Sequence, residues 1–318
     1  MKIFFAGATG AIGALVLPRL VRDGHDVTAI ARSREKADAI EAIGAHACLV
    51  DPLDRTALVR AVTSAQPQLI LHQLTALAQM RGDFKRFDEE FALTNRFRTE
   101  VTDTLLDAAR KVGTERLVAQ SFCGWPFARV GGPIKSEADP LDPDPPREVR
   151  KTLAAIRYLE DRLMTAENVQ TCVLRYGLFY GPGTGLSATG PLVDLVRKRR
   201  FPIVGRGTGI WSFIHIEDAA EATVAAITNR AAGLFNIVDD EPAPVSEWLP
   251  YLAHAVGAKK PLRMPVWLAR PLIGEAGVSM MLQARGGSNE KAKRILGWQP
   301  RYKSWRTGFV EGLGQAWH

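Results

Sequence analysis

Short apolar runs alternate with amphipathic segments through the first half of the chain. The runs have the length of buried strands and lie at residues 2–6, 26–31, 45–50, 68–71, 116–119 and 171–175. The segments between them carry apolar residues at helical spacing and lie at residues 12–20, 34–43, 54–65, 84–112 and 147–166. Repeated strand and helix predicts an α/β fold with a Rossmann-type, doubly wound parallel sheet.

The regular alternation stops after Gly181-Pro182-Gly183, and the later elements are separated by turns rich in Gly and Pro. This change predicts a larger domain at residues 1–175 and a smaller C-terminal lobe at residues 176–318, with some exchange of chain between them. Segment 140–146 has four prolines and cannot continue a helix or a central strand, so we expect a surface loop beside the site.

The turn after the first apolar run contains three glycines, Gly7, Gly10 and Gly13, with Thr9, Ala11 and Ile12 between them. A turn without side chains lets backbone N–H groups and the positive end of a helix approach a pyrophosphate. A tight turn that needs glycine only for its backbone geometry is the alternative. Because the motif joins the first strand to the first helix, we expect a dinucleotide cradle.

Composition narrows the class of protein. With 318 residues and 46% hydrophobic residues the chain can bury a large core, but no stretch approaches the ~20 apolar residues of a membrane span. The net charge of +7 favours anionic partners, for which a phosphorylated cofactor suffices, and nucleic acid is not expected. Three cysteines and six histidines without ligand spacing predict no metal site and, for the thiols, a reducing cytoplasmic location.

Several motifs together resemble the short-chain dehydrogenase/reductase superfamily, in its extended branch of sugar-nucleotide epimerases, dehydratases and related reductases. They are the glycine turn, Asn95 in a long helix, Leu174-Arg175 leading to Tyr180-Gly181-Pro182-Gly183, Phe213-Ile214-His215-Ile216-Glu217-Asp218-Ala219, and Leu296-Gly297-Trp298-Gln299-Pro300. The resemblance implies a nicotinamide cofactor on residues 1–175 and a small-molecule substrate beside residues 176–318.

The resemblance also implies a catalytic tyrosine and lysine four residues apart, with a glutamate four residues beyond the lysine. If Glu160 is that glutamate, Ile156 stands at the lysine position and Thr152 at the tyrosine position. Isoleucine carries no charge, and a threonine hydroxyl is a much poorer acid than a phenol, whose pKa is about 10. A shifted pair, Tyr158 with Arg162, stays open, as does Lys151 beside Thr152.

The serine that assists the tyrosine in such proteins is expected near Ser121, with Phe122 at the usual position. Ser121 and Thr152 are therefore the candidate catalytic hydroxyls, although Ser121 can equally cap a loop at the strand end.

The residue after the second strand decides between the two nicotinamide cofactors. NAD-binding cradles usually have an acidic residue there, for the ribose 2′-OH, whereas this chain has Arg32 and Ser33. A guanidinium pairs with a 2′-phosphate, so NADP(H) is favoured over NAD(H). By resemblance, the other cofactor-binding residues are Asp51, Leu53, Leu74, Thr75, Ala76, Asn95, Gln120 and Tyr176.

Three functions are consistent with these residues. The first is an atypical NADP-dependent oxidoreductase, the second a nucleotide-sugar epimerase or dehydratase, and the third a non-catalytic NADP-binding sensor or regulator. A pocket bounded by residues 122–127, 140–146 and 176–186 suits an apolar or ring-shaped ligand as well as a sugar. A homodimer through the helices at 84–112 and 147–166 is also possible, with Phe97 and Leu105 either at its interface or packed on the sheet.

Overall fold

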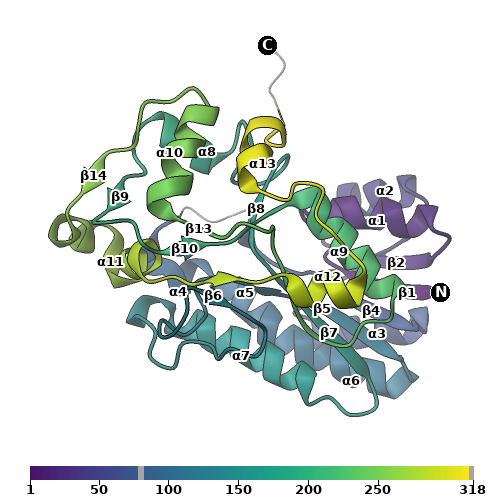
Figure 1. Ribbon diagram of the computed structural model, residues 1–318. Coiled ribbons are helices and arrows are strands. Elements are labelled where there is room, and N and C mark those ends of the chain that lie inside the picture. The colour runs from purple at the N-terminus through teal and green to yellow at the C-terminus, as the bar shows by residue number, and fades with distance from the viewer. Residues whose placement is uncertain (78–81, 315–318) are drawn as a thin grey trace.

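The computed structural model describes residues 1–77 and 82–314, and a seven-stranded parallel sheet forms its centre (Figure 1). The strand order is β12-β7-β5-β4-β1-β2-β3. The strands are β1 (Lys2–Ala6), β2 (Asp26–Ala31), β3 (His46–Leu49), β4 (Leu69–His72), β5 (Arg116–Phe122), β7 (Gln170–Tyr176) and β12 (Gly233–Ile237). The predicted α/β class and Rossmann-type sheet are confirmed.

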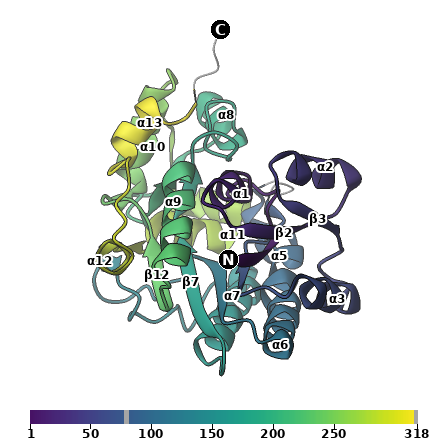
Figure 2. The ribbon, with the colours of Figure 1, turned by 90° about the vertical axis from the view of Figure 1, so that its right-hand side faces the viewer.

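Helices cover both faces of the sheet, as Figure 2 shows with α1 and α9 on one side and α3, α6 and α7 on the other. Successive side chains of a strand therefore enter different cores: Phe5 packs with α1 and α9, whereas Phe4 packs with α3, α6 and α7. These helices are α1 (Gly13–Arg22), α2 (Arg34–Ala42), α3 (Arg55–Ala65), α6 (Thr102–Val112), α7 (Arg150–Met164), α9 (Ile216–Thr228) and α12 (Glu290–Leu296).

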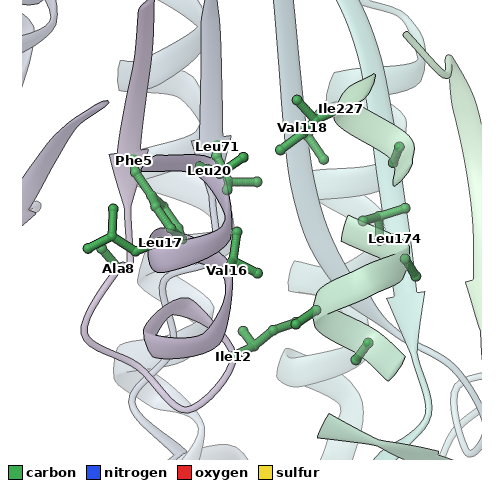
Figure 3. Packing of buried hydrophobic residues seen from close by; sticks show 14 of the residues in the cluster. Phe5, Ala8, Ile12, Val16, Leu17, Leu20, Leu71, Val118, Leu174 and Ile227 are labelled. Carbon is green, nitrogen blue, oxygen red and sulfur yellow. The ribbon is translucent and has the colours of Figure 1, made fainter. Parts of the chain in front are cut away.

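Helix α1 shows how the sequence pattern becomes a core. Val16, Leu17 and Leu20 are buried, and Figure 3 shows them directed at Phe5 and Leu71 of the sheet. The helical spacing that predicted this segment thus corresponds to the helix face that packs on the sheet. Since α1 starts directly above the end of β1, the same packing fixes the glycine turn.

Strand β5 is longer than the sequence predicts. It extends through Phe122 because it pairs with β7 in register from Arg116 opposite Gln170 to Phe122 opposite Tyr176. Ser121 therefore belongs to the strand and shares a face with Leu117 and Ala119, on the side where α7 packs.

The predicted helix at 84–112 is divided into η2 (Phe84–Arg86), α4 (Phe87–Glu90), α5 (Ala92–Arg96), the π-helical η3 (Phe97–Val101) and α6. The widened turn redirects hydrogen bonds, and the Phe97 carbonyl accepts one from Nε2 of His72, 3.2 Å away. His72 is buried, and burial lowers its pKa to about 4. It therefore holds η3 against the end of β4 as a neutral side chain.

Two residues proposed for a dimer interface pack on the sheet instead. Phe97 is 2% exposed and Leu105 is fully buried, and both contribute to the core under α6. Neither supports a dimer, which stays a prediction. In the described part of the chain, every helix is too short or too polar to span a bilayer.

The C-terminal part has its own aromatic core around Trp248, Trp305 and Phe213. Its helices are α8 (Pro191–Arg197), α10 (Val245–Ala255), α11 (Val266–Leu282) and α13 (Trp305–Glu311). Short strands accompany them and the loops of the larger domain: β6 (Ile134–Lys135), β8 (Leu178–Tyr180), β9 (Ile203–Val204), β10 (Ile210–Trp211), β11 (Phe213–His215), β13 (Ala243–Pro244), β14 (Arg263–Met264) and β15 (Gly286–Gly287). Because β12 and α9 return to the main sheet, the chain crosses between the parts more than once; the boundary at 175 stays a prediction.

Candidate cofactor and substrate site

The glycine turn packs against the chain that follows β4. Gly7 has a φ of +109°, and a Cβ on it would lie 2.6 Å from the carbonyl carbon of Gln73. A Cβ on Gly13 would lie 2.1 Å from the Gly7 carbonyl oxygen, whereas one on Gly10 would meet that oxygen at 3.4 Å. Gly7 and Gly13 are thus required by the fold, and Gly10 has room for a methyl group.

The same turn has the properties of an anion cradle. Thr9, Gly10 and Ala11 are exposed, and within residues 1–77 and 82–314 the N–H groups of Ala11 and Ile12 find no acceptor. Helix α1 has neither a side-chain cap nor an acidic residue in its first turn. Free N–H groups at an uncapped helix start fit a pyrophosphate, so the residues present fit a dinucleotide.

The ends of β2 and β3 bring the expected adenosine-side residues to this edge. Arg32 is exposed directly after β2 and has no partner among the described residues. Ser33 caps α2 by accepting a hydrogen bond from the Lys36 N–H, and Oδ1 of Asp51 accepts one from the Leu53 N–H. A free guanidinium beside an exposed turn fits a phosphate group.

The loop after β4 is held from both sides. Gln120 donates from Nε2 to the Leu74 carbonyl over 3.1 Å, and Oγ1 of Thr94 accepts from the Ala76 N–H over 3.0 Å. Leu74, Thr75 and Ala76 therefore lie next to the glycine turn, as expected for a loop beneath a dinucleotide.

Tyr176 lies in the core at the end of β7. Its phenol accepts a hydrogen bond from Nε2 of Gln73 and donates to Thr223, whose own proton goes to the Ala219 carbonyl. Burial raises the pKa of Tyr176, so its proton is firmly held. Its predicted role in cofactor binding remains untested.

Thr152 is fully buried at the start of α7, and its hydroxyl donates to Oδ1 of Asp88 over 2.7 Å. Asp88 also accepts from the backbone N–H groups of Lys151 and Thr152, so this carboxylate of α4 caps α7. Asn95 donates from Nδ2 to the Thr152 hydroxyl and accepts from Arg98. The expected cofactor contact of Asn95 and the catalytic role of Thr152 stay predictions.

Ser121 joins a second buried network. Its hydroxyl donates to Oε1 of Glu160 over 2.7 Å, and both Glu160 oxygens accept from Arg175 over 2.7 and 2.6 Å. All three side chains are at most 5% exposed. The network ties β5, β7 and α7 together; the catalytic role of Ser121 stays a prediction.

The alternative pair lies on the outside of α7. Tyr158 is 40% exposed and donates to Asp103 of α6, which also pairs with Arg162. The carboxylate raises the pKa of Tyr158. Since Tyr158 and Ile156 are two residues apart on one helix, Tyr158 faces away from the buried side of α7.

Aromatic side chains gather beside the start of α7. Phe87 stacks on Phe91 with ring centroids 4.4 Å apart and meets Trp125 edge to face at 5.4 Å. Phe122 follows at 6.4 Å from Trp125. The predicted pocket segments 122–127 and 140–146 also meet here, around a cavity of about 10 Å³.

Helix α11 closes this cavity with Ala276, Ser279 and Met280, where the sequence pattern predicted segment 176–186. Neither α11 nor Asp88 was recognised from the sequence as part of the site. Asp88 is 64 residues from Thr152, so no local signal marks the contact.

Residues 3–237 match the NAD dependent epimerase/dehydratase family. The chain belongs to this family. It is 40% identical over 309 residues to the 3-diazoavenalumate denitrifying reductase of a Streptomyces species, an alignment that covers 97% of this chain and 99% of the relative. It is 27% identical over 304 residues to the 4-hydroxy-2-methyl-3-oxo-4-farnesyl-3,4-dihydroquinoline-1-oxide ketoreductase of Stigmatella aurantiaca, covering 93% and 87%.

Among solved structures, the family member UDP-glucose 4-epimerase of Thermus thermophilus, in complex with NAD, matches with a TM-score of 0.73. The sequences are 23% identical, and 98% of each chain is covered. This likeness shows the fold alone. The relatives include reductases and epimerases, and the resemblance to extended short-chain dehydrogenases/reductases drawn from the sequence is confirmed.

Proposed function

We propose that this protein is an NADP(H)-dependent reductase that transfers hydride to an electrophilic carbon of a ring-shaped substrate without a proton from a tyrosine. The positions of the five tyrosines are the observation that carries the proposal. Tyr158 is outside on α7, and Tyr176 is held by Gln73 and Thr223. Tyr180, Tyr251 and Tyr302 pack in the aromatic core of the C-terminal lobe.

The candidate hydroxyls are committed as well. The proton of Thr152 goes to Asp88 and that of Ser121 to Glu160, and both side chains are buried. Ile156, at the expected lysine position, is 1% exposed and cannot lower the pKa of a neighbour by charge. These contacts support a reaction in which no side chain has to donate a proton.

NADP(H) is the cofactor we propose for the glycine turn. When bound, it supplies a hydride. The chain holds its pyrophosphate through the free N–H groups of Ala11 and Ile12, and Arg32 pairs with the 2′-phosphate. Thr9, Gly10, Ser33, Asp51 and Leu53 complete the exposed edge on which the cofactor lies.

The Streptomyces relative suggests a substrate class that needs no proton donor. Its name describes a denitrifying reductase of a diazo compound. If hydride reaches a diazonium carbon, a C–H bond forms while the C–N bond breaks and its electron pair leaves with N₂. The cationic substrate and the hydride balance in charge, so the step needs no added proton, and the cofactor is oxidised to NADP⁺.

The aromatic cluster of Phe87, Phe91, Phe122 and Trp125 supports an aromatic substrate. Stacked rings bury a flat apolar ligand and exclude water, which would otherwise displace N₂. A nucleotide sugar would instead need a phenol or another base for its transient oxidation.

The test follows NADPH absorbance with purified protein and three kinds of compound: 4-carboxybenzenediazonium, a panel of ketones, and UDP-glucose. We expect oxidation of NADPH and release of N₂ with the diazonium ion, above the rate without protein. Conversion of UDP-glucose to its epimer would favour the epimerase function. Tight NADPH binding without turnover of any compound would favour a sensor or regulator.

A further inference from the structure

Exposed apolar side chains gather at the start of α11. Trp267 is 75% exposed, Leu272 56%, Leu262 50% and Leu268 40%. Leu268 and Leu272 are four residues apart on one helix, so they share a face. Figure 1 shows α11 with β9 and β14 at the end of the molecule away from β1 and β2. Such a group on a monomer's surface usually marks a contact site.

Cations surround this apolar group. Segment 197–206 has five basic residues and segment 259–270 has four, and neither has an acidic residue. All nine are exposed. They are Arg197, Lys198, Arg199, Arg200, Arg206, Lys259, Lys260, Arg263 and Arg270. In the part of the chain that the structure describes, only Lys198 and Arg270 of these pair with a carboxylate.

The two basic segments lie side by side. Strands β9 and β14 pair in register, with Arg263 opposite Ile203. Nε of Arg199 donates to the Lys260 carbonyl over 3.1 Å, and the Ile203 N–H donates to the Leu262 carbonyl over 2.8 Å. The nine cations and the four apolar side chains therefore form one area, the β9–β14 surface.

We propose that the β9–β14 surface docks on an anionic phospholipid bilayer, with Trp267, Leu268 and Leu272 in the interfacial layer and the cations at the lipid phosphates. A tryptophan and two leucines flanked by unpaired Lys and Arg have the composition of an interfacial membrane contact. The charge is complementary to acidic headgroups. Nucleic acid would pair with the cations but gives no role to exposed leucines. The docking is peripheral and needs no membrane span.

The experiment is co-sedimentation of the full chain with vesicles of phosphatidylcholine alone and of phosphatidylcholine mixed with phosphatidylglycerol. We expect binding only to the anionic vesicles, weakened by high salt. Two variants probe the two components: Trp267→Ala with Leu272→Ser, and Lys259→Glu with Lys260→Glu. Each should weaken binding at least about tenfold, because apolar insertion and headgroup attraction act together.

Matched controls change exposed residues elsewhere: Val310→Ser for the apolar pair, and Arg60→Glu with Lys111→Glu for the cationic pair. Controls should bind like the wild type, and thermal unfolding shows that each variant is folded. No binding of the wild type to anionic vesicles at low salt overturns the proposal. So does binding that Trp267→Ala with Leu272→Ser leaves unchanged, or that the control charge reversal weakens equally.

Discussion

The hydroxyl of Thr152 donates a 2.7 Å hydrogen bond to Oδ1 of Asp88, which joins the start of α7 to α4. Asp88 accepts three hydrogen bonds there, two of them from backbone N–H groups of the first turn of α7. The position at which related enzymes are expected to carry a phenol is thus part of a helix cap. The contact gives Thr152 a structural task, and its effect on catalysis can be separated from that task.

Thr152→Val should lower stability and leave turnover nearly unchanged. A hydrogen bond to a carboxylate is lost, at a cost of about 1–2 kcal/mol, while Asp88 keeps its backbone partners. Under the proposed reaction we expect kcat to change by less than about threefold; loss of a catalytic acid would cost about a hundredfold. Urea unfolding and NADPH consumption measure the two effects. Thr104→Val, whose hydroxyl bonds a carbonyl of its own helix, is the control.

Glu160→Gln should be strongly destabilising. It leaves the buried Arg175 guanidinium without a carboxylate and weakens the acceptor of Ser121, at a cost of about 3–5 kcal/mol. Glu115→Gln is the matched control, because its partner Arg230 and Glu115 itself lie in water. Equal unfolding midpoints for the two variants would contradict the role of the buried network.

Arg32→Glu should reverse the cofactor preference. The wild type is expected to bind NADPH about tenfold to a hundredfold more tightly than NADH, because a charged hydrogen-bonded contact contributes roughly 1.5–3 kcal/mol. Calorimetry with both cofactors measures this. Arg34→Glu changes a neighbouring cation that already pairs with Asp38, and it should keep the wild-type preference. An unchanged preference in Arg32→Glu would remove Arg32 from the 2′-phosphate site.

His72 should make stability fall in mild acid. Burial lowers its pKa to about 4 in the folded protein, whereas the ordinary value is 6.5. The unfolded state therefore takes up a proton first, and stability is lost as pH falls from about 6.5 to about 4, by about 3 kcal/mol in total. In His72→Gln this loss is absent. Urea unfolding across that range should show the wild-type advantage shrinking, and a constant difference would contradict the account.

The cofactor edge could be predicted from the sequence because its signals are local. Gly7, Gly10 and Gly13 stand between one strand and one helix, and Arg32 directly follows the next strand. Strand ends in a parallel sheet meet at one edge, so the spatial grouping follows from the order of elements.

The substrate side could not be predicted in this way. Ser121 was expected at a loop, but pairing of β5 with β7 extends the strand and directs its hydroxyl at Glu160. Asp88 meets Thr152 across 64 residues, and the break of the predicted long helix at η3 depends on the carbonyl contact with His72. Each of these contacts is long-range, and none leaves a periodic pattern.

Isotope tracing tests the central claim most directly. The protein is incubated with 4-carboxybenzenediazonium and NADPH that carries deuterium at both C4 positions, in ordinary water, beside a reaction without protein and one with unlabelled NADPH in D₂O. We predict benzoate with one deuterium at the carbon that carried the diazonium group in the first reaction, and none from D₂O. Protein-dependent product whose new hydrogen comes from solvent, or no protein-dependent product, would contradict hydride transfer without a proton donor.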